Sequence, residues 1–516
     1  YTFLFDHVVG LDQVTATDRF AEATPDLTTA ILTEAGKMCE EVMAPLQRPG
    51  DLHPARLENG VVRTSPGYAE GYRAIAEGGW VGMAADPEYG GMGLPMTVTT
   101  AVNEMMSAAC LSLQLSPLMT QGQIEALEHH ASDELKALYL PKLISGEWTG
   151  TMNLTEPQAG SDVGALSSKA EENGDGTYSV SGQKIYISWG DNDFTDNVCH
   201  LVLARLPGAP AGTKGISLFL VPRNLPEGGG LAAMFTMMNN ARLGVGGQGV
   251  GAAEGAYQHA LAYALDRKQG RTEGETGAII DHADVRRMLM TMRADTYAAR
   301  GIALMCAVAI DMTTATGDDK WKSRAALLTP IAKAFGTDIG NEVAGMGIQV
   351  HGGMGFVEET GAAQYARDVR VTTIYEGTNG IQAMDLVARK MMDGGEAAGL
   401  LMDEIEAAAE AARDTLPDLA EPVWQACESL RETTEWMIAQ NHRVRSAGAV
   451  PYLRAFARVL GGHIHLTSAM NDPKGPRAKV AQFYIQRLLP DHSSLLAQAQ
   501  AGDYDVYALT PEEFAA

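Results

Sequence analysis

The stretch over residues 370–382 contains an acidic side chain whose surroundings suit proton transfer. Glu376 follows a mostly apolar run and precedes Gly377, and few compensating charges lie beside it. A carboxylate in such surroundings tends to have a raised pKa, which suits a general base that works near neutral pH. Taken alone, the stretch favours an ordinary helix start, with Thr378 as the cap and Glu376 near the positive dipole end. The catalytic interpretation therefore needs support from other stretches.

Residues 154–163 could meet a polar ring edge and a phosphate. They leave a predicted strand through a turn rich in proline and glycine, where Thr155 and Ser161 offer hydroxyl and backbone N–H groups. An ordinary loop with Asx-type turns has the same composition, so the pattern leaves both interpretations open.

Residues 184–190 could pack against a flat heterocycle. A strand here places Tyr186 and Ser188 on one face, so an aromatic plate stands beside a hydroxyl that can bond the ring edge. A strand with one aromatic side chain on the core is the structural alternative, and it is favoured if the motif stands alone.

Two further stretches could contact phosphates. Arg267 and Gln269 follow a predicted helix and could clamp a pyrophosphate, although a basic last turn that complements a helix dipole is very common. Residues 347–356 include Gly352 and Gly353, which resemble a dinucleotide-binding loop. No strand precedes them in a βαβ unit, so we reject a Rossmann fold. Two interpretations stay open: a glycine-rich turn whose backbone N–H groups bind phosphate, and an ordinary turn between two helices.

Composition narrows the function classes. The chain has 516 residues and a net charge of −25, which argues against general affinity for nucleic acid or anionic membranes. We find no run of 18 or more apolar residues, and therefore predict no spanning helix and no membrane insertion. The 5 cysteines are scattered without a C-x-x-C pair, which predicts buried thiols in a reducing compartment, and so a cytoplasmic protein with no signal segment.

Hydrophobic periodicity predicts an α+β chain with four parts. They are an N-terminal helical domain over residues 1–147, a central antiparallel β domain over 148–226, a C-terminal helical bundle over 227–394, and a helical extension over 395–516. The bundle and the extension follow because the helical period returns after residue 230 and persists. Four arginines of the extension form a local basic cluster, interpreted as a subunit contact or a CoA neighbourhood: Arg443, Arg445, Arg454 and Arg458.

Together, five stretches resemble the acyl-CoA dehydrogenase family. Their motifs occur in register across an α–β–α layout between residues 25 and 395, over residues 154–163, 184–190, 267–270, 349–353 and 375–382. The resemblance implies an FAD flavoenzyme whose C-terminal domain is a four-helix bundle with oligomer contacts. It also implies an acyl-CoA substrate, an electron-transferring flavoprotein as acceptor, and a homodimer or higher homo-oligomer.

The resemblance assigns roles to single residues. Glu376 corresponds to the catalytic base of the Tyr-Glu-Gly-Thr signature, and Ala241 stands where some relatives place the base, immediately before an arginine. The residues implied in FAD binding are Leu154, Thr155, Ser161, Tyr186, Ser188, Arg267, Gln269, Gln349, Gly352, Gly353 and Thr378. Those implied in substrate binding are Ser161, Arg242, Tyr375 and Gly377. No metal site is expected.

Two departures from the general family pattern are visible. The extension and residues 187–205 are similar to a longer subgroup, which makes 3-methylmercaptopropionyl-CoA the best candidate substrate and methylthioacryloyl-CoA its product. The β domain stops early, since Pro226 runs straight into Glu227, where relatives continue for some tens of residues. Because a real deletion here would expose sheet edges, we expect that further residues, absent from the printed sequence, stand between these two residues.

The implied reaction is α,β-dehydrogenation of a short acyl-CoA to a trans-2-enoyl-CoA. Glu376 takes the α-proton while the β-hydride goes to flavin N5, and hydrogen bonds to the thioester oxygen stabilise the developing enolate. In the family these bonds come from the backbone N–H of the base and a flavin ribityl hydroxyl. The alternatives are a generic short- or medium-chain acyl-CoA dehydrogenase, an acyl-CoA oxidase, and a non-catalytic flavoprotein of the same fold.

Overall fold

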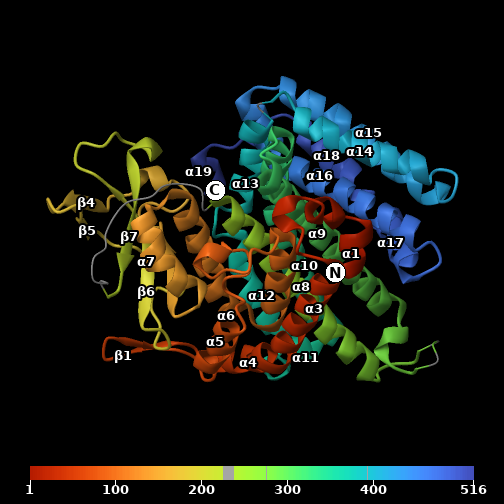
Figure 1. The fold of residues 1–516 in the computed structure, drawn as a ribbon. Coiled ribbons are helices and arrows are strands. Elements are labelled where there is room, and N and C mark those ends of the chain that lie inside the picture. The colour runs from red at the N-terminus through yellow and green to blue at the C-terminus, as the bar shows by residue number, and fades with distance from the viewer. Residues whose placement is uncertain (225–237, 273, 275, 392) are drawn as a thin grey trace. The chain divides into compact units, whose positions relative to one another are not determined.

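The structure is a computed structural model that describes residues 1–224, 238–272, 274, 276–391 and 393–516 (Figure 1). Backbone contacts divide the chain into two compact units, residues 25–244, and residues 1–24 together with 245–516. We call them the first unit and the second unit. The additional residues expected after Pro226 lie outside the described residues. The sequence also predicts a helix over 231–238, and most of that range lies outside them as well. The four domain ranges stay a prediction.

The first unit begins with helices. They are α3 (Pro25–Met38), the π-helical turn η2 (Cys39–Met43), α4 (Ala44–Leu52), α5 (Tyr68–Glu77), α6 (Met96–His130) and α7 (Asp133–Ile144), with a short 3-10 turn η3 (Pro87–Tyr89). Proline usually ends a helix, so the sequence predicts a helix end at Pro45, and this prediction is wrong. Helical backbone continues from α3 through η2 into α4, and the π-helical turn η2 lies directly before α4, whose first turn contains Pro45. Cys110 leaves the helical region within α6 (φ −158°, ψ 89°), which explains why the sequence pattern there predicts two helices.

The β part of the first unit holds a hairpin, β1 (Arg56–Glu58) with β2 (Val61–Arg63), and a five-stranded sheet. The sheet strands are β3 (Trp148–Asn153), β4 (Lys169–Glu172), β5 (Tyr178–Ser181), β6 (Asn197–Arg205) and β7 (Ile216–Pro222), with 3-10 turns η4 (Val163–Ala165) and η5 (Thr213–Gly215). The predicted antiparallel order is wrong in part. β6 pairs antiparallel with β7, but parallel with β3 and β4.

The second unit contains the N-terminal segment and the helical bundle. The segment has α1 (Thr2–His7), α2 (Leu11–Thr15) and η1 (Asp18–Phe20). The bundle has α8 (Met238–Asp266, whose first turns belong to the first unit), η6 (Ile279–Asp281), α9 (Ala283–Thr316), α10 (Asp319–His351), α11 (Gly353–Phe356), η7 (Glu358–Thr360), α12 (Ala362–Arg370), η8 (Val371–Thr373), α13 (Asn379–Asp385) and the π-helical turn η9 (Leu386–Lys390).

Glycines let α8 and α10 approach each other at backbone distance. A Cβ added at Gly249 would lie 2.3 Å from the carbonyl oxygen of Gly336, and one at Gly340 would lie 2.6 Å from that of Gly249. Any side chain at these positions would push the helices apart. Part of the high glycine content therefore serves helix packing in the bundle, which fixes α10 beneath the turn that carries Glu376.

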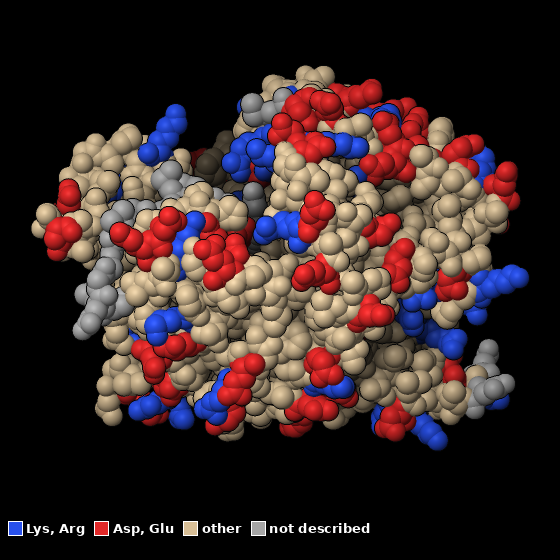
Figure 2. All heavy atoms as spheres, in the orientation of Figure 1, with Lys and Arg blue, Asp and Glu red and all other residues tan. Residues whose placement is uncertain are grey.

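The C-terminal extension is helical, as predicted. It contains α14 (Glu396–Ala412), α15 (Pro417–Ala439), α16 (His442–Asn471), α17 (Pro476–Arg487), α18 (Asp491–Ala499) and α19 (Pro511–Phe514). Figure 2 shows acidic side chains gathered over α14 and α15, while the opposite face of α14 buries residues such as Leu401 and Ile405. The acidic, alanine-rich residues of α14 thus form an exposed helix face.

The prediction of no membrane insertion stays a prediction. Among the described residues, α9 is long and apolar enough to cross a membrane by length and composition. However, 72% of its most apolar window is buried inside the fold, as in the core helix of a bundle. All five cysteines are buried and form no disulfide, which confirms the prediction of buried thiols.

Candidate active site

The turn that carries Glu376 joins η8 to α13 in the second unit. Glu376 has a left-handed backbone conformation (φ 55°), which is uncommon for a residue with a side chain, and Gly377 follows with φ 84°. Such a conformation costs on the order of 1–3 kcal/mol and persists only where its surroundings impose it. Thr378 caps α13, because its hydroxyl accepts a hydrogen bond from the Ile381 N–H at 3.3 Å. The helix-start interpretation is therefore correct, but a cap alone does not require a strained Glu376.

Donors buried beneath the turn fix its backbone carbonyls. The Gln382 side-chain amide donates to the carbonyl oxygens of Glu376 and Gly377, each at 3.2 Å. The Lys333 ammonium of α10 also donates to the Gly377 carbonyl, at 2.9 Å. Both side chains are fully buried at 0% exposure, so water competes little for these bonds. Together they hold the peptide planes that follow the carboxylate.

Asn379, the first residue of α13, ties the turn to α10. Its side-chain oxygen accepts from Lys333 Nζ at 2.9 Å, and its amide nitrogen donates to Asp338 Oδ1 at 2.7 Å. The sequence motifs did not indicate a role for Lys333 or Asn379. Lys333 lies in an otherwise apolar stretch of α10, which is the signal that could have indicated a buried cation with a specific task.

Tyr375 is fixed beside the base. Its hydroxyl donates a short hydrogen bond to the Gln248 side-chain oxygen of α8. Burial, together with the nearby charge of Glu376, raises the pKa of the Tyr375 phenol above its usual value, so the phenol stays neutral at physiological pH. The predicted raised pKa of Glu376 itself stays a prediction, as do the substrate contacts of Tyr375 and Gly377.

In the first unit, two loops that the motifs single out lie side by side. The Ile185 N–H donates to the carbonyl of Thr155 at 3.0 Å, and Lys184 Nζ donates to the carbonyl of Leu154 at 3.0 Å. Leu154 and Thr155 therefore lie next to the segment that carries Tyr186. This adjacency agrees with the shared role that the family resemblance implies for them.

A buried ion pair locks these loops together. The Glu156 carboxylate accepts from Lys184 Nζ at 2.8 Å, and the two side chains are only 1% and 9% exposed. The same carboxylate accepts from the Ser167 N–H and hydroxyl and from the Ser168 N–H. Although burial raises its pKa, the hydrogen bonds from Lys184 and the serines outweigh burial and hold the pKa of Glu156 well below its usual value. Sequence analysis quoted both residues within its motifs but missed their pairing.

The predicted strand over residues 184–188 is wrong. The segment forms a loop and turn, with Tyr186 at φ 59° and Trp189 at φ 52°, so Tyr186 and Ser188 do not alternate along a strand. The physical reason is competition from side chains. Lys184 is drawn to Glu156, and the Trp189 indole N–H donates to the Ser112 carbonyl at 2.9 Å. Tyr186 nevertheless remains 90% exposed, which leaves its ring face available to a flat ligand.

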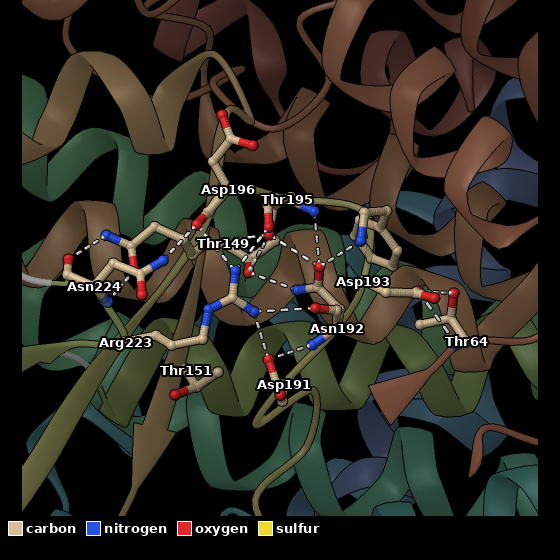
Figure 3. Close-up of polar contacts among 12 residues, drawn as sticks. Thr64, Thr149, Thr151, Asp191, Asn192, Asp193, Thr195, Asp196, Arg223 and Asn224 are labelled. Carbon is tan, nitrogen blue, oxygen red and sulfur yellow. Dashed lines mark hydrogen bonds and ion pairs between the residues drawn. The ribbon is translucent and has the colours of Figure 1, made fainter. Parts of the chain in front are cut away.

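Figure 3 shows the polar contacts that anchor the loop after Ser188. Arg223 donates to the Asp191 carboxylate at 2.6 Å and to the backbone oxygen of Asn192 at 3.1 Å. The Asn192 side chain in turn donates to the Thr149 hydroxyl of β3 at 3.1 Å. The loop that carries Tyr186 is therefore held at both ends, by Glu156 before it and by Arg223 after it.

The residues predicted to reach a pyrophosphate gather at one end of the bundle. Arg267 and Gln269 are exposed and hydrogen bond each other at 3.3 Å. Tyr263, in the last turns of α8, stacks on His351 at the end of α10 with ring centroids 4.4 Å apart. This contact brings the Arg267 pair close in the fold to the glycine turn at the end of α10. In that turn Gln349, Gly352 and Gly353 are exposed.

Two further predicted contacts, Ser161 and Arg242, differ in exposure. Ser161 is exposed in the loop between β3 and η4. Arg242 is buried at 6% exposure in the first turns of α8. The predicted roles of both residues stay predictions. The described residues contain no group of three or more His, Cys, Asp or Glu side chains able to hold a metal ion.

Family models match nearly the whole chain. The N-terminal domain of acyl-CoA dehydrogenase matches residues 28–147, its middle domain 151–249 and its C-terminal domain 228–392. A further model, described as acetyl-CoA dehydrogenase C-terminal like, matches residues 401–510. The chain therefore belongs to the acyl-CoA dehydrogenase family, an oxidoreductase family whose cofactor is FAD.

Individual relatives support this assignment. The chain is 43% identical over 456 residues to 3-methylmercaptopropionyl-CoA dehydrogenase of Ruegeria pomeroyi, and the match covers 78% of each chain. It is 30% identical over 546 residues to a butyryl-CoA dehydrogenase of Syntrophomonas wolfei, covering 88% of each. In fold it resembles Caenorhabditis elegans ACDH-11 in complex with C11-CoA, with a TM-score of 0.74 and 19% identity over 94% of this chain and 91% of that one. The predicted family, fold class and enzyme class are confirmed.

The residues present suit FAD. An exposed tyrosine ring beside two loops locked by a buried ion pair can hold an isoalloxazine ring. An exposed arginine–glutamine pair and an exposed glycine turn can bind a pyrophosphate. In the first unit, the loops of Leu154, Thr155 and Tyr186 would meet a flavin ring. In the second unit, Arg267, Gln269 and Gly353 would bind phosphates, which the family resemblance assigns to the FAD of a neighbouring subunit, and both roles stay predictions.

Proposed function

We propose that this protein catalyses FAD-dependent α,β-dehydrogenation of a short acyl-CoA, and that 3-methylmercaptopropionyl-CoA is its substrate. The product is then methylthioacryloyl-CoA. The observation that supports the reaction most strongly is the Glu376 turn, which is strained, capped and held through its carbonyls. The substrate proposal rests on the 43% identical relative that carries that activity.

Glu376 is the group that removes the α-proton. Because the α-proton of a thioester is only weakly acidic, a carboxylate can take it only if the growing negative charge on the thioester oxygen is stabilised. The bonds from Lys333 and Gln382 fix the backbone on the C-terminal side of the base before substrate arrives. Bound FAD supplies the acceptor for the hydride that leaves the β-carbon.

The electron acceptor and the assembly are further proposals. We infer that an electron-transferring flavoprotein accepts the electrons, since this is the acceptor that family membership suggests, and that the protein is a homo-oligomer.

An acyl-CoA oxidase would share every motif but would pass electrons to oxygen. Release of hydrogen peroxide in air at the rate of substrate turnover would favour the oxidase. A cytoplasmic location and the lack of nucleic-acid or membrane partners stay predictions.

An anaerobic titration with a panel of acyl-CoA thioesters tests the substrate proposal. The FAD-loaded protein is mixed with 3-methylmercaptopropionyl-, propionyl-, butyryl- and octanoyl-CoA, and the loss of flavin absorbance near 450 nm is followed, where oxidised flavins absorb. We expect the fastest bleaching with 3-methylmercaptopropionyl-CoA. Faster bleaching with octanoyl-CoA would contradict a short thioether substrate, and no bleaching with any thioester would contradict the reaction class.

A further inference from the structure

We propose that α16, a helix of the C-terminal extension, helps to hold the turn that carries Glu376, and that Arg454 is a positioning residue for this base. The proposal rests on the proposed function, because it takes Glu376 as the base. It assigns a task to an extension that the rest of the mechanism does not use. All of the residues concerned belong to the second unit.

The first link runs from the turn to α10. Asn379 begins α13, directly after the glycine and threonine that follow Glu376, and its amide donates to Asp338 Oδ1 at 2.7 Å. It also donates to the Thr337 hydroxyl at 3.0 Å and to the Ala334 carbonyl at 3.2 Å. These contacts fix the start of α13 against one face of α10, so the position of that face sets the position of the turn.

The second link runs from the same face of α10 to α16. Glu342 lies one helical turn after Asp338, so both carboxylates point to the same side of the helix. Arg454 holds the Glu342 carboxylate with both terminal nitrogens, at 2.6 and 2.9 Å. Burial raises the pKa of Asp338, whereas the Asn379 bond and the charge of Arg454 oppose this rise. Arg454 therefore acts electrostatically on the carboxylate that ties down Asn379.

Neighbouring charges make this contact part of a balanced cluster. One turn further along α16, Arg458 binds Asp295 of α9, and these side chains are 3% and 1% exposed. The Tyr484 hydroxyl donates to the Arg458 carbonyl at 3.1 Å, which anchors α16 to α17. Three basic and three acidic side chains make up this cluster, which we call the α10–α16 charge cluster: Lys333, Arg454, Arg458, Asp295, Asp338 and Glu342.

Each of the four extension arginines has a partner within the chain, and their interpretation as a subunit contact or a CoA neighbourhood stays a prediction. Arg454 and Arg458 bind acids of the bundle. Arg443 pairs with Asp503 at 2.6 Å, and Arg445 donates to backbone carbonyls such as that of Gln440 at 2.9 Å. The Arg454 and Glu342 side chains are 26% and 37% exposed, so water screens part of their attraction. Loss of Arg454 still removes a positive charge that acts on Glu342 and Asp338, and both acids lie on the face of α10 that holds Asn379.

Arg431 offers a matched control within the same extension. Its side chain is 26% exposed, as is that of Arg454, and it also contacts carboxylate oxygens closely, at 2.8 Å to Asp403 and 2.7 Å to Glu406. These acids lie on α14, and none of its contacts reaches α10 or α13. Loss of either arginine should therefore affect the stability of the extension, but only loss of Arg454 should affect the turn.

The test compares Arg454→Met with Arg431→Met in the full-length, FAD-loaded protein. Stopped-flow mixing with 3-methylmercaptopropionyl-CoA under anaerobic conditions gives the limiting rate constant of flavin reduction and the apparent Kd. For Arg454→Met we expect a rate constant lowered about tenfold with Kd changed less than about twofold, because a displaced base slows the chemical step more than binding. For Arg431→Met we expect neither to change. Amide hydrogen exchange of residues 378–385 should be faster in Arg454→Met alone.

Two outcomes would overturn the proposal. One is equal rate constants for the two variants, and the other is unchanged exchange at residues 378–385 in Arg454→Met. If Arg454→Met does not yield FAD-loaded protein, Arg454→Lys keeps the charge but loses the two-pronged contact, and we expect it to slow flavin reduction about threefold. Normal flavin reduction in that variant too would contradict the proposal. Glu376→Gln, measured in parallel, separates the failures, because normal reduction in Glu376→Gln would contradict the proposed function itself.

Discussion

The loop that carries Tyr186 in the first unit and the turn that carries Glu376 in the second unit are held in different ways. In the first unit, the Glu156 carboxylate gathers Lys184 and the two serines around one buried charge, and this ion pair locks the loop of Tyr186. In the second unit, the supports of the Glu376 turn act on its backbone, through Lys333 and Gln382 on its carbonyls. The Glu156 carboxylate itself therefore holds the first loop in place. In the Glu376 turn, other side chains hold the backbone.

The difference matters for chemistry. A carboxylate that accepts several strong hydrogen bonds has its pKa pushed down and is a poor base, as for Glu156. A base must instead keep a pKa close to the working pH. Support through the backbone fixes the peptide planes that follow the Glu376 side chain. Removal of the Glu156 carboxylate should therefore lower mainly the folding stability and the FAD content. Removal of the Glu376 carboxylate should lower mainly the rate of flavin reduction.

The largest expected loss of stability follows from Glu156→Gln. The variant leaves Lys184 buried without its counter-charge, and breaking a buried ion pair typically costs about 3–5 kcal/mol. Urea unfolding of the FAD-loaded protein should show this loss, together with a lower FAD content after purification. Glu147→Gln is the control, because the pair of Glu147 with Lys142 is exposed and should contribute less than about 1 kcal/mol. Equal losses for the two variants would show that the buried pair is not a scaffold.

The pH dependence of unfolding sharpens the same point. The folded-state pKa of Glu156 lies below its unfolded-state value, so its contribution is fully present above about pH 4.3 and is lost as the pH falls below it. Between pH 6 and pH 3 the wild-type protein should therefore lose more unfolding free energy than Glu156→Gln, by urea unfolding at each pH. Parallel losses in both proteins would exclude a depressed pKa at this residue.

A smaller effect is expected at the strained turn. Gly377 has φ 84°, so Gly377→Ala should cost about 1–2 kcal/mol and slow flavin reduction. Gly380→Ala is the matched control, since Gly380 lies in the first turn of α13 and the nearest atom to an added Cβ is the Thr378 hydroxyl at 3.8 Å. That variant should be neutral or stabilising by up to about 1 kcal/mol. The thermal unfolding midpoints of the two variants test this expectation. A lower midpoint for Gly380→Ala together with an unchanged midpoint for Gly377→Ala would contradict backbone strain at Gly377.

Local patterns in the sequence predicted the turn, and distant pairings explain what they missed. The cap at Thr378 and the glycine after Glu376 are adjacent in the chain, so both could be predicted. The alternating apolar residues after Lys184 predicted a strand, because nothing nearby indicates a partner for Lys184 at Glu156, 28 residues away. Likewise, the parallel pairing of β3 with β6 joins segments 49 residues apart, such as Trp148 with Asn197.

The extension shows the same limit. The sequence around Arg454 predicted only a basic cluster, because the acidic partners lie far away in the chain. Glu342, the partner of Arg454, is 112 residues away, and Asp295, the partner of Arg458, is 163 residues away. Hydrophobic periodicity predicts that α16 is a helix, but not which of its charged side chains are buried. Only the packing of α9, α10 and α16 reveals the charge cluster.

Flavin reduction in Glu376→Gln tests the central claim most directly. The FAD-loaded wild-type and variant proteins are mixed anaerobically with 3-methylmercaptopropionyl-CoA, and the absorbance of oxidised flavin is followed. Because the amide cannot accept the α-proton, we expect the variant to retain FAD and to bleach about 10²- to 10⁴-fold more slowly than wild type. Bleaching of the variant at the wild-type rate would contradict the assignment of Glu376 as the base.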